Sequence, residues 1–200
     1  KRSLSAIQAA VRDLAQNNQV PFVLGGEHLL TLPAVQGLTA VHGSDLTVLQ
    51  FDAHADLRAE YEGEVLSHAT VMRQLAEVVP PGNIYQFGIR SATAAEVSYA
   101  RSHTHFFPFQ VLEPVAAVRS SLGDRPVYVS IDIDVFDPAF APGVGTPEPG
   151  GQTVTAMLAA LKLLQGLNIV GADIVEVCPP FDPSERTAAL AALLVRELLL

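Results

Sequence analysis

Short apolar runs alternate along the chain with longer stretches in which apolar side chains recur at helical spacing. Near the start, Leu4, Ile7, Val11 and Leu14 fall on one face of a helix that ends at Asn17. The same periodicity predicts further helices at 29–40, 67–79, 93–102, 110–122, 153–165 and 184–199. The residues expected to cap helix starts are Ser67, Thr153 and Ser184.

The apolar runs between these helices have the length of strands. They lie at 20–25, 46–51, 84–89, 127–133 and 168–177, with a weaker run at 104–107. Because they are apolar on both faces and separated by helices, they predict βαβ units and a mainly parallel sheet. No repeat or linker divides the sequence, so we expect residues 1–200 to form one domain.

Composition narrows the class of protein. Apolar residues make up 49% of the chain and charged residues 16%, which excludes general disorder. The formal net charge of −9 opposes a nucleic-acid partner and suits cationic ligands, metal ions included. Cys178 is the single cysteine, which excludes an internal disulfide and a thiolate zinc site and fits a cytoplasmic location.

Membrane insertion is not expected. The most apolar run, 188–200, is short and is interrupted by Arg196 and Glu197. No signal peptide precedes the first helix. The sequence opens without methionine and directly on a helix, so we expect it to be part of a longer protein.

The stretch FDAHADLR places Asp52, His54 and Asp56 at alternate positions after a predicted strand. Alternate side chains of an extended segment point to the same side, so these three are expected to converge. The carboxyl ends of parallel strands meet at one edge of the sheet. Two other strand ends also carry candidate ligands, namely Asp132, Asp134 and His28.

Four aspartates and two histidines at one site require cations. Taken singly, each motif also suits a solvated loop or a tight turn, but their coincidence at three strand ends favours a site. Oxygen-rich ligands with some imidazole suit Mn²⁺ better than Zn²⁺, Ca²⁺ or Mg²⁺. Six ligand side chains predict two ions that share carboxylates and a hydroxide nucleophile.

Five motifs resemble the ureohydrolase (arginase/agmatinase) family, and the agmatinase branch most closely. They are GGEH, FDAHADLR, SHATVMR, SIDIDVFDPAFAPGVGTPEPGG and ADIVEVCPPFDPSERTA, which together span nearly the whole chain. The resemblance implies a three-layer αβα fold with a mainly parallel sheet and a two-manganese centre. It also implies hydrolysis of a guanidino compound to urea and an amine, by a homotrimer or homohexamer.

The resemblance also implies the ligand sets. It places His28, Asp52, Asp56 and Asp132 around one manganese, and His54 and Asp134 with shared oxygens of Asp52 and Asp132 around the other. A hydroxide bridging the two ions would attack the guanidinium carbon.

The resemblance also implies roles in substrate binding and proton transfer. Glu176 would hold the substrate guanidinium, because a carboxylate can bond two of its nitrogens at once. Thr146 would line the reacting group. Asp56 would relay a proton to the departing amine, and His68 would replenish it from solvent.

Two departures from the family pattern stand out. Leu29 follows the histidine of GGEH, where the family usually has serine, which alters the surroundings of His28. The amino-terminal portion of the family, including its first strand, is missing from this sequence.

The sequence indicates the substrate less directly than it indicates the metal ligands. The loop 59–68 carries Glu60, Glu62 and Glu64, which would attract a free amine and so favour agmatine, although a solvated loop explains them equally well. Arginine, guanidinobutyrate, guanidinopropionate, proclavaminate and guanidine remain open. Two alternatives are a zinc deacetylase of related fold, disfavoured by the second set of ligands, and a catalytically silent metal-binding member, disfavoured by the intact Glu176 and His68.

Other polar residues are interpreted as structural. His103 and His105 have the spacing of a metal pair but no carboxylate neighbour. Arg58 and Arg90 are expected to be ion-pair partners.

Overall fold

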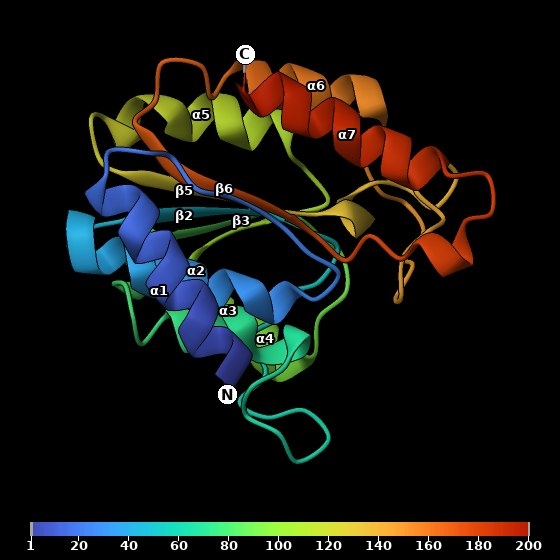
Figure 1. Cartoon of the computed structure of the whole chain (residues 1–200). Helices are drawn as coiled ribbons and strands as arrows, with labels where there is room; N and C mark the ends of the chain where they lie inside the picture. The colour runs from blue at the N-terminus through green and yellow to red at the C-terminus, as the bar shows by residue number, and fades with distance from the viewer. Residues whose placement is uncertain (1, 200) are drawn as a thin grey trace.

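The computed structural model describes residues 2–199, which form a parallel sheet between two layers of helices (Figure 1). In these residues the sheet has six strands in the order β1-β6-β5-β2-β3-β4, and every neighbouring pair is parallel. The strands are β1 (Phe22–Leu24), β2 (Thr47–Phe51), β3 (Ile84–Ile89), β4 (His105–Pro108), β5 (Val127–Asp132) and β6 (Ile169–Val175). The predicted α/β class is confirmed.

Helices cover both faces of the sheet, which confirms the three-layer αβα arrangement (Figure 1). One layer consists of α1 (Arg2–Gln16), α2 (Thr31–His42), α3 (Val71–Leu75) and α4 (Ala94–His103). The other consists of α5 (Leu112–Leu122), α6 (Val154–Lys162) and α7 (Arg186–Leu199). Short 3₁₀ turns are η1 (His28–Leu30), η2 (His68–Thr70), η3 (Pro81–Asn83), η4 (Ile133–Val135) and η5 (Pro179–Phe181).

Strand alternation divides the apolar side chains between two cores. In β2, Leu49 and Phe51 pack into the core under α5, α6 and α7, whereas Val48 packs into the core under α1 to α4. In β5, Val129 and Tyr128 divide in the same way. Both faces of the central strands are therefore buried, which explains why their sequences read as continuous apolar runs.

Some predicted boundaries are wrong. The helix expected at 67–79 divides into η2 and the short α3. Ser184 does not cap α7, because the carboxylate of Asp182 accepts the N–H of Thr187 instead. Thr153 does cap α6, accepting the N–H of Ala156.

The strand order reverses between β2 and β5, because β2 leads outward to β3 and β4 whereas β5 leads the other way to β6. Open parallel sheets place ligand sites beyond the carboxyl ends of the strands at such a reversal. The motifs at the ends of β2 and β5 therefore occupy the expected position.

Candidate metal centre and active site

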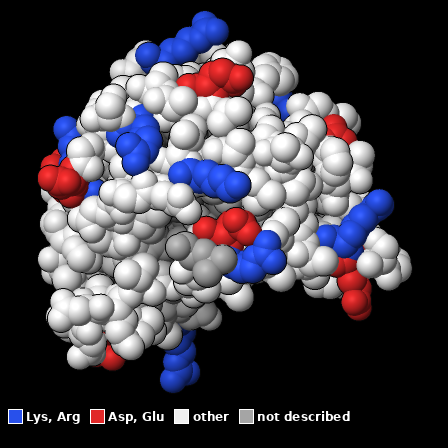
Figure 2. Space-filling view, turned by 90° about the horizontal axis from the view of Figure 1, so that it is seen from above, with Lys and Arg blue, Asp and Glu red and all other residues white. Residues whose placement is uncertain are grey.

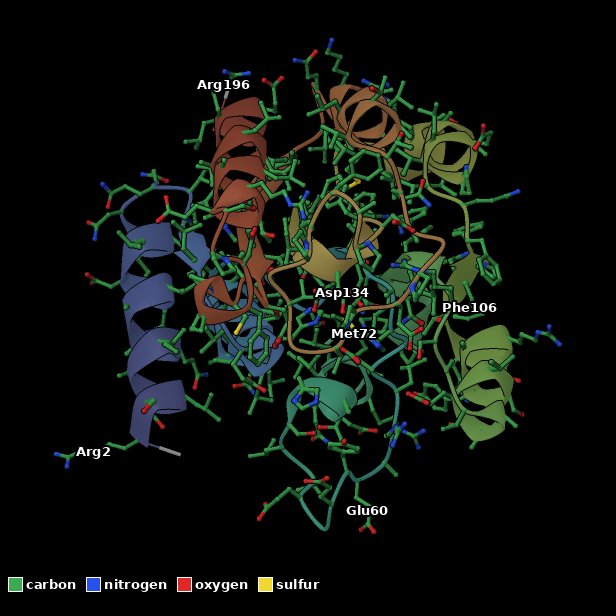
Figure 3. The ribbon with its side chains drawn as sticks, turned by 90° about the vertical axis from the view of Figure 1, so that its right-hand side faces the viewer. Arg2, Glu60, Met72, Phe106, Asp134 and Arg196 are labelled. Atoms are coloured by element: carbon green, nitrogen blue, oxygen red, sulfur yellow. The ribbon has the colours of Figure 1, made fainter. Side chains whose placement is uncertain are left out.

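The predicted Asp and His residues meet at the carboxyl ends of the central strands. Asp52 directly follows β2, Asp132 ends β5, Asp134 lies in η4 and His28 begins η1. Figure 3 labels Asp134 near the middle of the view, between the loops that leave the strand ends. Segments far apart in the sequence thus contribute to one cluster.

His28 faces three carboxylates. Its Nδ1 lies 3.2 Å from Asp52 Oδ2 and 3.1 Å from Asp56 Oδ2. The distance from Nδ1 to Asp132 Oδ2 is 3.3 Å. All four side chains are buried, so water screens these charges little.

His54 and Asp134 form a second cluster beside the first. His54 Nδ1 lies 2.9 Å from Asp134 Oδ2 and 3.7 Å from Asp52 Oδ1. Ligand atoms of His28, Asp52 and Asp56 lie within 4.8 Å of one another, as do those of Asp52, His54 and Asp134. Asp52 belongs to both groups, with Oδ2 toward His28 and Oδ1 toward His54.

The FDAHADLR segment converges through a turn, whereas strand alternation alone was expected. Asp56 has a φ of 53°, in the left-handed region, and its carbonyl accepts the N–H groups of Met72 and Arg73. Glu176, just beyond β6, has a φ of 62°. Such conformations cost about 1–3 kcal/mol each in non-glycine residues and persist where the surroundings hold them, often at functional sites.

The arrangement around His28 fits a bound cation. Ser130 donates its hydroxyl proton to Asp173, so Ser130 Oγ accepts from His28 Nε2–H at 3.1 Å. That leaves His28 Nδ1 facing carboxylates, and it has no hydrogen-bond partner in residues 2–199. Asp134 Oδ2 is also buried, and the nitrogen beside it is His54 Nδ1 at 2.9 Å, which can donate to it only when it carries a proton. A proton or a metal ion at these atoms would offset the repulsion.

Most pKa values of the cluster are raised, which means that these side chains favour binding a proton or another cation. Burial opposes the charged form of His54, but its contacts with Asp134 and Asp52 outweigh burial and raise its pKa to about 11. Burial and the charge of Asp52 raise the pKa of Asp56 to about 7. Burial, followed by neighbouring carboxylates, also raises the pKa of Asp132 and Asp134. Divalent cations would compete with protons for these groups.

A cavity of ≈ 470 Å³ opens above the cluster. Asp132, His54 and Asp56 form part of its wall, and the predicted residues His68, Thr146 and Glu176 line it as well. The structure therefore brings together every residue assigned a ligand or substrate role from the sequence.

Glu176 and His68 have defined neighbours within the cavity. Glu176 Oε1 accepts the N–H of His28 at 2.7 Å, and burial raises the pKa of the Glu176 carboxyl. His68 is half-exposed, with Nδ1 3.6 Å from Glu27 Oε1 and its ring edge-on to Tyr61 at 5.4 Å. Glu176 is thus anchored by a backbone hydrogen bond, whereas His68 lies where the cavity meets solvent.

Several lining residues were not predicted. They are Tyr61, Ser91, Thr93, Glu96 and Glu148. Glu148 belongs to the Pro- and Gly-rich loop after β5, and that composition was the available signal for it. Glu60, Glu62 and Glu64, which the sequence suited equally to a substrate amine or to a solvated loop, are exposed and do not line the cavity, as a solvated loop would have them. Figure 3 shows Glu60 on a projecting loop.

The residues interpreted as structural have varied surroundings. Arg58 lies 3.7 Å from Glu96, as an ion-pair partner would, yet it also lines the cavity. Arg90 differs from expectation because its guanidinium donates to backbone carbonyls. These belong to Gly88, Asp134, Val135, Phe136 and Glu148, so Arg90 ties η4 to the loop 143–151.

His103 and His105 form no metal cluster in the described chain. His103 stacks on Tyr99, and His105 stacks on Tyr85. Leu29, at the departure from the GGEH pattern, packs against the core under α1 to α4.

Comparison with known proteins places these features in a family. The sequence model described as "Arginase family" matches residues 1–200. The agmatinase of Bacillus subtilis (strain 168) is 45% identical over 203 residues, which cover 100% of this chain and 70% of that protein. The guanidinobutyrase of Pseudomonas aeruginosa is 38% identical over 192 residues, covering 90% of this chain and 60% of that protein.

Solved structures agree with the sequence comparison. Proclavaminate amidino hydrolase from Streptomyces clavuligerus superposes with a TM-score of 0.88 at 35% identity, covering 98% of this chain and 68% of that one. Arginase from Bacillus caldovelox superposes with a TM-score of 0.87 at 26% identity, covering 98% of this chain and 74% of that one. The chain belongs to the arginase family, whose relatives are hydrolases acting on guanidino compounds.

Proposed function

We propose that this protein hydrolyses agmatine to urea and putrescine with two Mn²⁺ ions. The observation that carries the proposal is the pair of largely buried His/Asp groups that share Asp52 beneath the cavity containing Glu176. Similarity to agmatinases at 45% identity supports the reaction class. The wholly oxygen and imidazole donor set supports manganese.

The proposed ligands fall into two sets. His28, Asp52, Asp56 and Asp132 would hold one ion, and His54 and Asp134 the other, with Asp52 and Asp132 shared. When bound, the ions would supply Lewis-acid stabilisation of developing negative charge and acidify a water molecule.

The chain's own side chains would then bind and orient the substrate. Glu176 would hold the guanidinium, because its carboxylate is fixed by the His28 N–H and is partly shielded from water. A guanidinium is resonance-stabilised and a poor electrophile, so its orientation toward the attacking water matters for the rate.

Proton movements complete the reaction. Asp56 would accept a proton from the attacking water and deliver it to the nitrogen that leaves as the amine. His68, half-exposed at the mouth of the cavity, would take up a proton from solvent and pass it toward the departing amine. One water is consumed, the bond from the guanidinium carbon to the substituted nitrogen breaks, and urea and a protonated amine result.

Charge around the cavity supports a dicationic substrate. Glu96, Glu148 and Glu176 line it, and Arg58 is partly neutralised by Glu96. Complementary charge favours binding of agmatine, which is cationic at both ends. Arg58 also supports a second candidate, a guanidino acid such as guanidinobutyrate, because its guanidinium can pair with a carboxylate.

A substrate panel tests the function. Protein stripped of metal and reloaded with Mn²⁺ should release urea from agmatine with a higher kcat/KM than from arginine, guanidinobutyrate, guanidinopropionate, proclavaminate or guanidine. Highest activity on guanidinobutyrate would replace the substrate and keep the reaction. Absence of urea from every compound at saturating Mn²⁺ would refute hydrolysis.

We also propose that residues 1–200 form one ureohydrolase domain that assembles as a homotrimer or homohexamer in the cytoplasm, as membership of the family supports.

No helix within residues 2–199 is long and apolar enough to cross a membrane. Figure 2 shows acidic and basic side chains interspersed over the face formed by α5, α6 and α7, without the continuous basic stripe that nucleic acid requires. Analytical ultracentrifugation would measure the assembly.

A further inference from the structure

A row of buried polar side chains crosses the sheet directly beneath the cluster. Asp173 of β6, Ser130 of β5, Gln50 of β2 and Gln86 of β3 are register partners on successive strands. Each has no exposed surface. We call these four residues the polar row.

The polar row faces the layer of α1 to α4. Strand neighbours two residues before its members, Tyr128, Val48 and Ile84, belong to the core under that layer. Alternation therefore puts four polar side chains into an otherwise apolar core. Burial of a polar group is unfavourable unless its hydrogen bonds are made, so the contacts of each member matter.

Gln50 and Gln86 have only one consistent orientation. Gln50 Nε2 donates to Asp52 Oδ2 at 2.7 Å and to the carbonyl of His54 at 3.2 Å. Gln86 Nε2 donates to Gln50 Oε1 at 2.7 Å and to the carbonyl of Ala55 at 2.8 Å. A flipped amide would turn its oxygen toward acceptors, so Gln86 fixes Gln50 and Gln50 faces Asp52 with a donor.

The chain of amides ends at Thr104, whose Oγ1 lies 3.0 Å from Gln86 Oε1 and 3.2 Å from the carbonyl oxygen of Ala100, so its single proton can be donated to either. Both amide groups use their two protons, and Gln50 also uses its oxygen. A fully satisfied buried network is rigid, whereas a partly satisfied one is unfavourable.

The two oxygens of Asp52 are consequently held in different environments. Oδ1 accepts the N–H of His54 at 2.6 Å, and Oδ2 accepts from Gln50. Rotation of the carboxylate would break both bonds. In the held orientation, Oδ2 faces His28 and Oδ1 faces His54.

We propose that Gln50 and Gln86 are positioning residues that set Asp52 to serve two cation sites at once. Gln50 acts on Asp52 directly, and Gln86 acts through Gln50. Because both amides are neutral, they orient the carboxylate without neutralising the charge that a cation needs. The inference rests on the proposed dinuclear centre and is independent of the substrate.

Titration of metal-free protein with Mn²⁺ tests the proposal. The wild type should bind two ions per chain. Gln50→Leu should weaken binding about 10–100-fold, and Gln86→Leu about tenfold, as is typical when a partner of a metal ligand is removed. Thr47→Val is the matched control, because Thr47 is buried in β2 and its hydroxyl has no hydrogen-bond partner among the described residues. It should change affinity by less than about twofold.

A double-mutant cycle separates positioning from packing. If Gln86 acts through Gln50, then Gln86→Leu should add less than about twofold to the loss already caused by Gln50→Leu. A full tenfold further loss would overturn the relay. If circular dichroism shows that Gln86→Leu is not folded, Gln86→Met takes its place, because methionine keeps the length of the side chain.

Electron paramagnetic resonance gives a readout that a merely structural role would not change. Two Mn²⁺ ions sharing a carboxylate should give an exchange-coupled spectrum in the wild type and in Thr47→Val, altered in Gln50→Leu. Wild-type affinity and spectrum in both glutamine variants would overturn this inference alone. A wild type that binds no Mn²⁺ would overturn the proposed dinuclear centre itself.

Discussion

The polar row and the rim of the cavity are built in opposite ways. The rim is formed by the loops 59–68 and 143–151, and its side chains reach solvent, with His68 42% and Glu148 37% exposed, whereas every member of the polar row is 0% exposed. The polar row contacts the Asp and His cluster that any guanidino substrate would need. The rim lines the part of the cavity that meets solvent. The two regions differ in burial, and under the proposed function we expect the polar row to support the reaction and the rim to influence the choice of substrate.

The polar row itself has a charged end and a neutral end. Asp173 accepts the hydroxyl protons of Thr31, Tyr128 and Ser130, and through Ser130 it sets the tautomer of His28. The amides of Gln50 and Gln86 set the orientation of a carboxylate instead. The two ends therefore support the two kinds of ligand by different means.

The largest expected effect comes from breaking the charged end. Asp173→Ala leaves three buried hydroxyl donors without their acceptor, at about 1–3 kcal/mol each, partly offset because a buried charge is also removed. We expect the free energy of unfolding of the metal-free protein to fall by about 3 kcal/mol in a urea titration. Mn²⁺ affinity should fall at least about tenfold, because Ser130 no longer fixes the tautomer of His28.

Thr47→Val again serves as the control. Unchanged Mn²⁺ affinity in Asp173→Ala would contradict the role of the polar row in holding His28, even if stability falls.

The central strands and the convergence of the Asp and His motifs could be predicted because both depend on local patterns. Strand ends are visible in FDAHADLR and SIDID without knowledge of the rest of the fold, although turns and not strand alternation bring Asp56 and Asp134 to the cluster. The polar row could not be predicted so directly. Gln50, Gln86 and Asp173 each interrupt an apolar run, but only the strand order and register show that they are neighbours.

The rim was predicted least well. Its conformation depends on turn geometry, such as the positive φ of Glu62 and Gly63 that reverses the chain at the loop tip. This reversal leaves the glutamates exposed and turns Tyr61 toward the cavity. The start of the helix predicted at 67–79 was placed too early for a related reason, since the backbone carbonyl of Asp56 accepts the N–H groups of Met72 and Arg73 in the first turn of α3.

A rim variant should alter substrate binding without altering metal content. Tyr61 is held by paired backbone bonds with Glu64, and its ring contacts His68 and lies 5.0 Å from the Arg58 guanidinium. Tyr61→Ala should raise KM for agmatine about tenfold, about 1.4 kcal/mol of lost contact, while kcat and bound Mn²⁺ change little.

The matched control is Val65→Ala, which truncates an exposed side chain of the same loop. Steady-state kinetics and elemental analysis on both variants would measure the difference. Loss of Mn²⁺ in Tyr61→Ala would contradict the separation between rim and polar row.

The smallest expected effect concerns the anchor of the rim. Asp182 accepts from the N–H and the hydroxyl of Thr187, and Thr187 Oγ1 in turn accepts the N–H of Gly143, where the loop 143–151 begins. Hydrogen bonds from the Ser184 hydroxyl and the Thr187 N–H lower the pKa of Asp182 to about 2. A lowered pKa means that the stabilisation is complete above the ordinary pKa of 3.8 and is lost as the pH falls through about 2.

Asp182→Ala should therefore lower the Tm of the metal-free protein by about 2–4 °C at pH 7. The difference from the wild type should shrink as the pH falls from about 4 toward 2, because the wild-type carboxylate then gains a proton. Ser184→Ala removes the hydroxyl that contributes most to the lowered pKa of Asp182 but leaves the two Thr187 bonds in place, so it should lower the Tm less than Asp182→Ala does and should weaken the pH dependence. Calorimetric melts across this pH range would measure the effect. A pH-independent difference would show that Asp182 acts on α7 and the rim through packing alone.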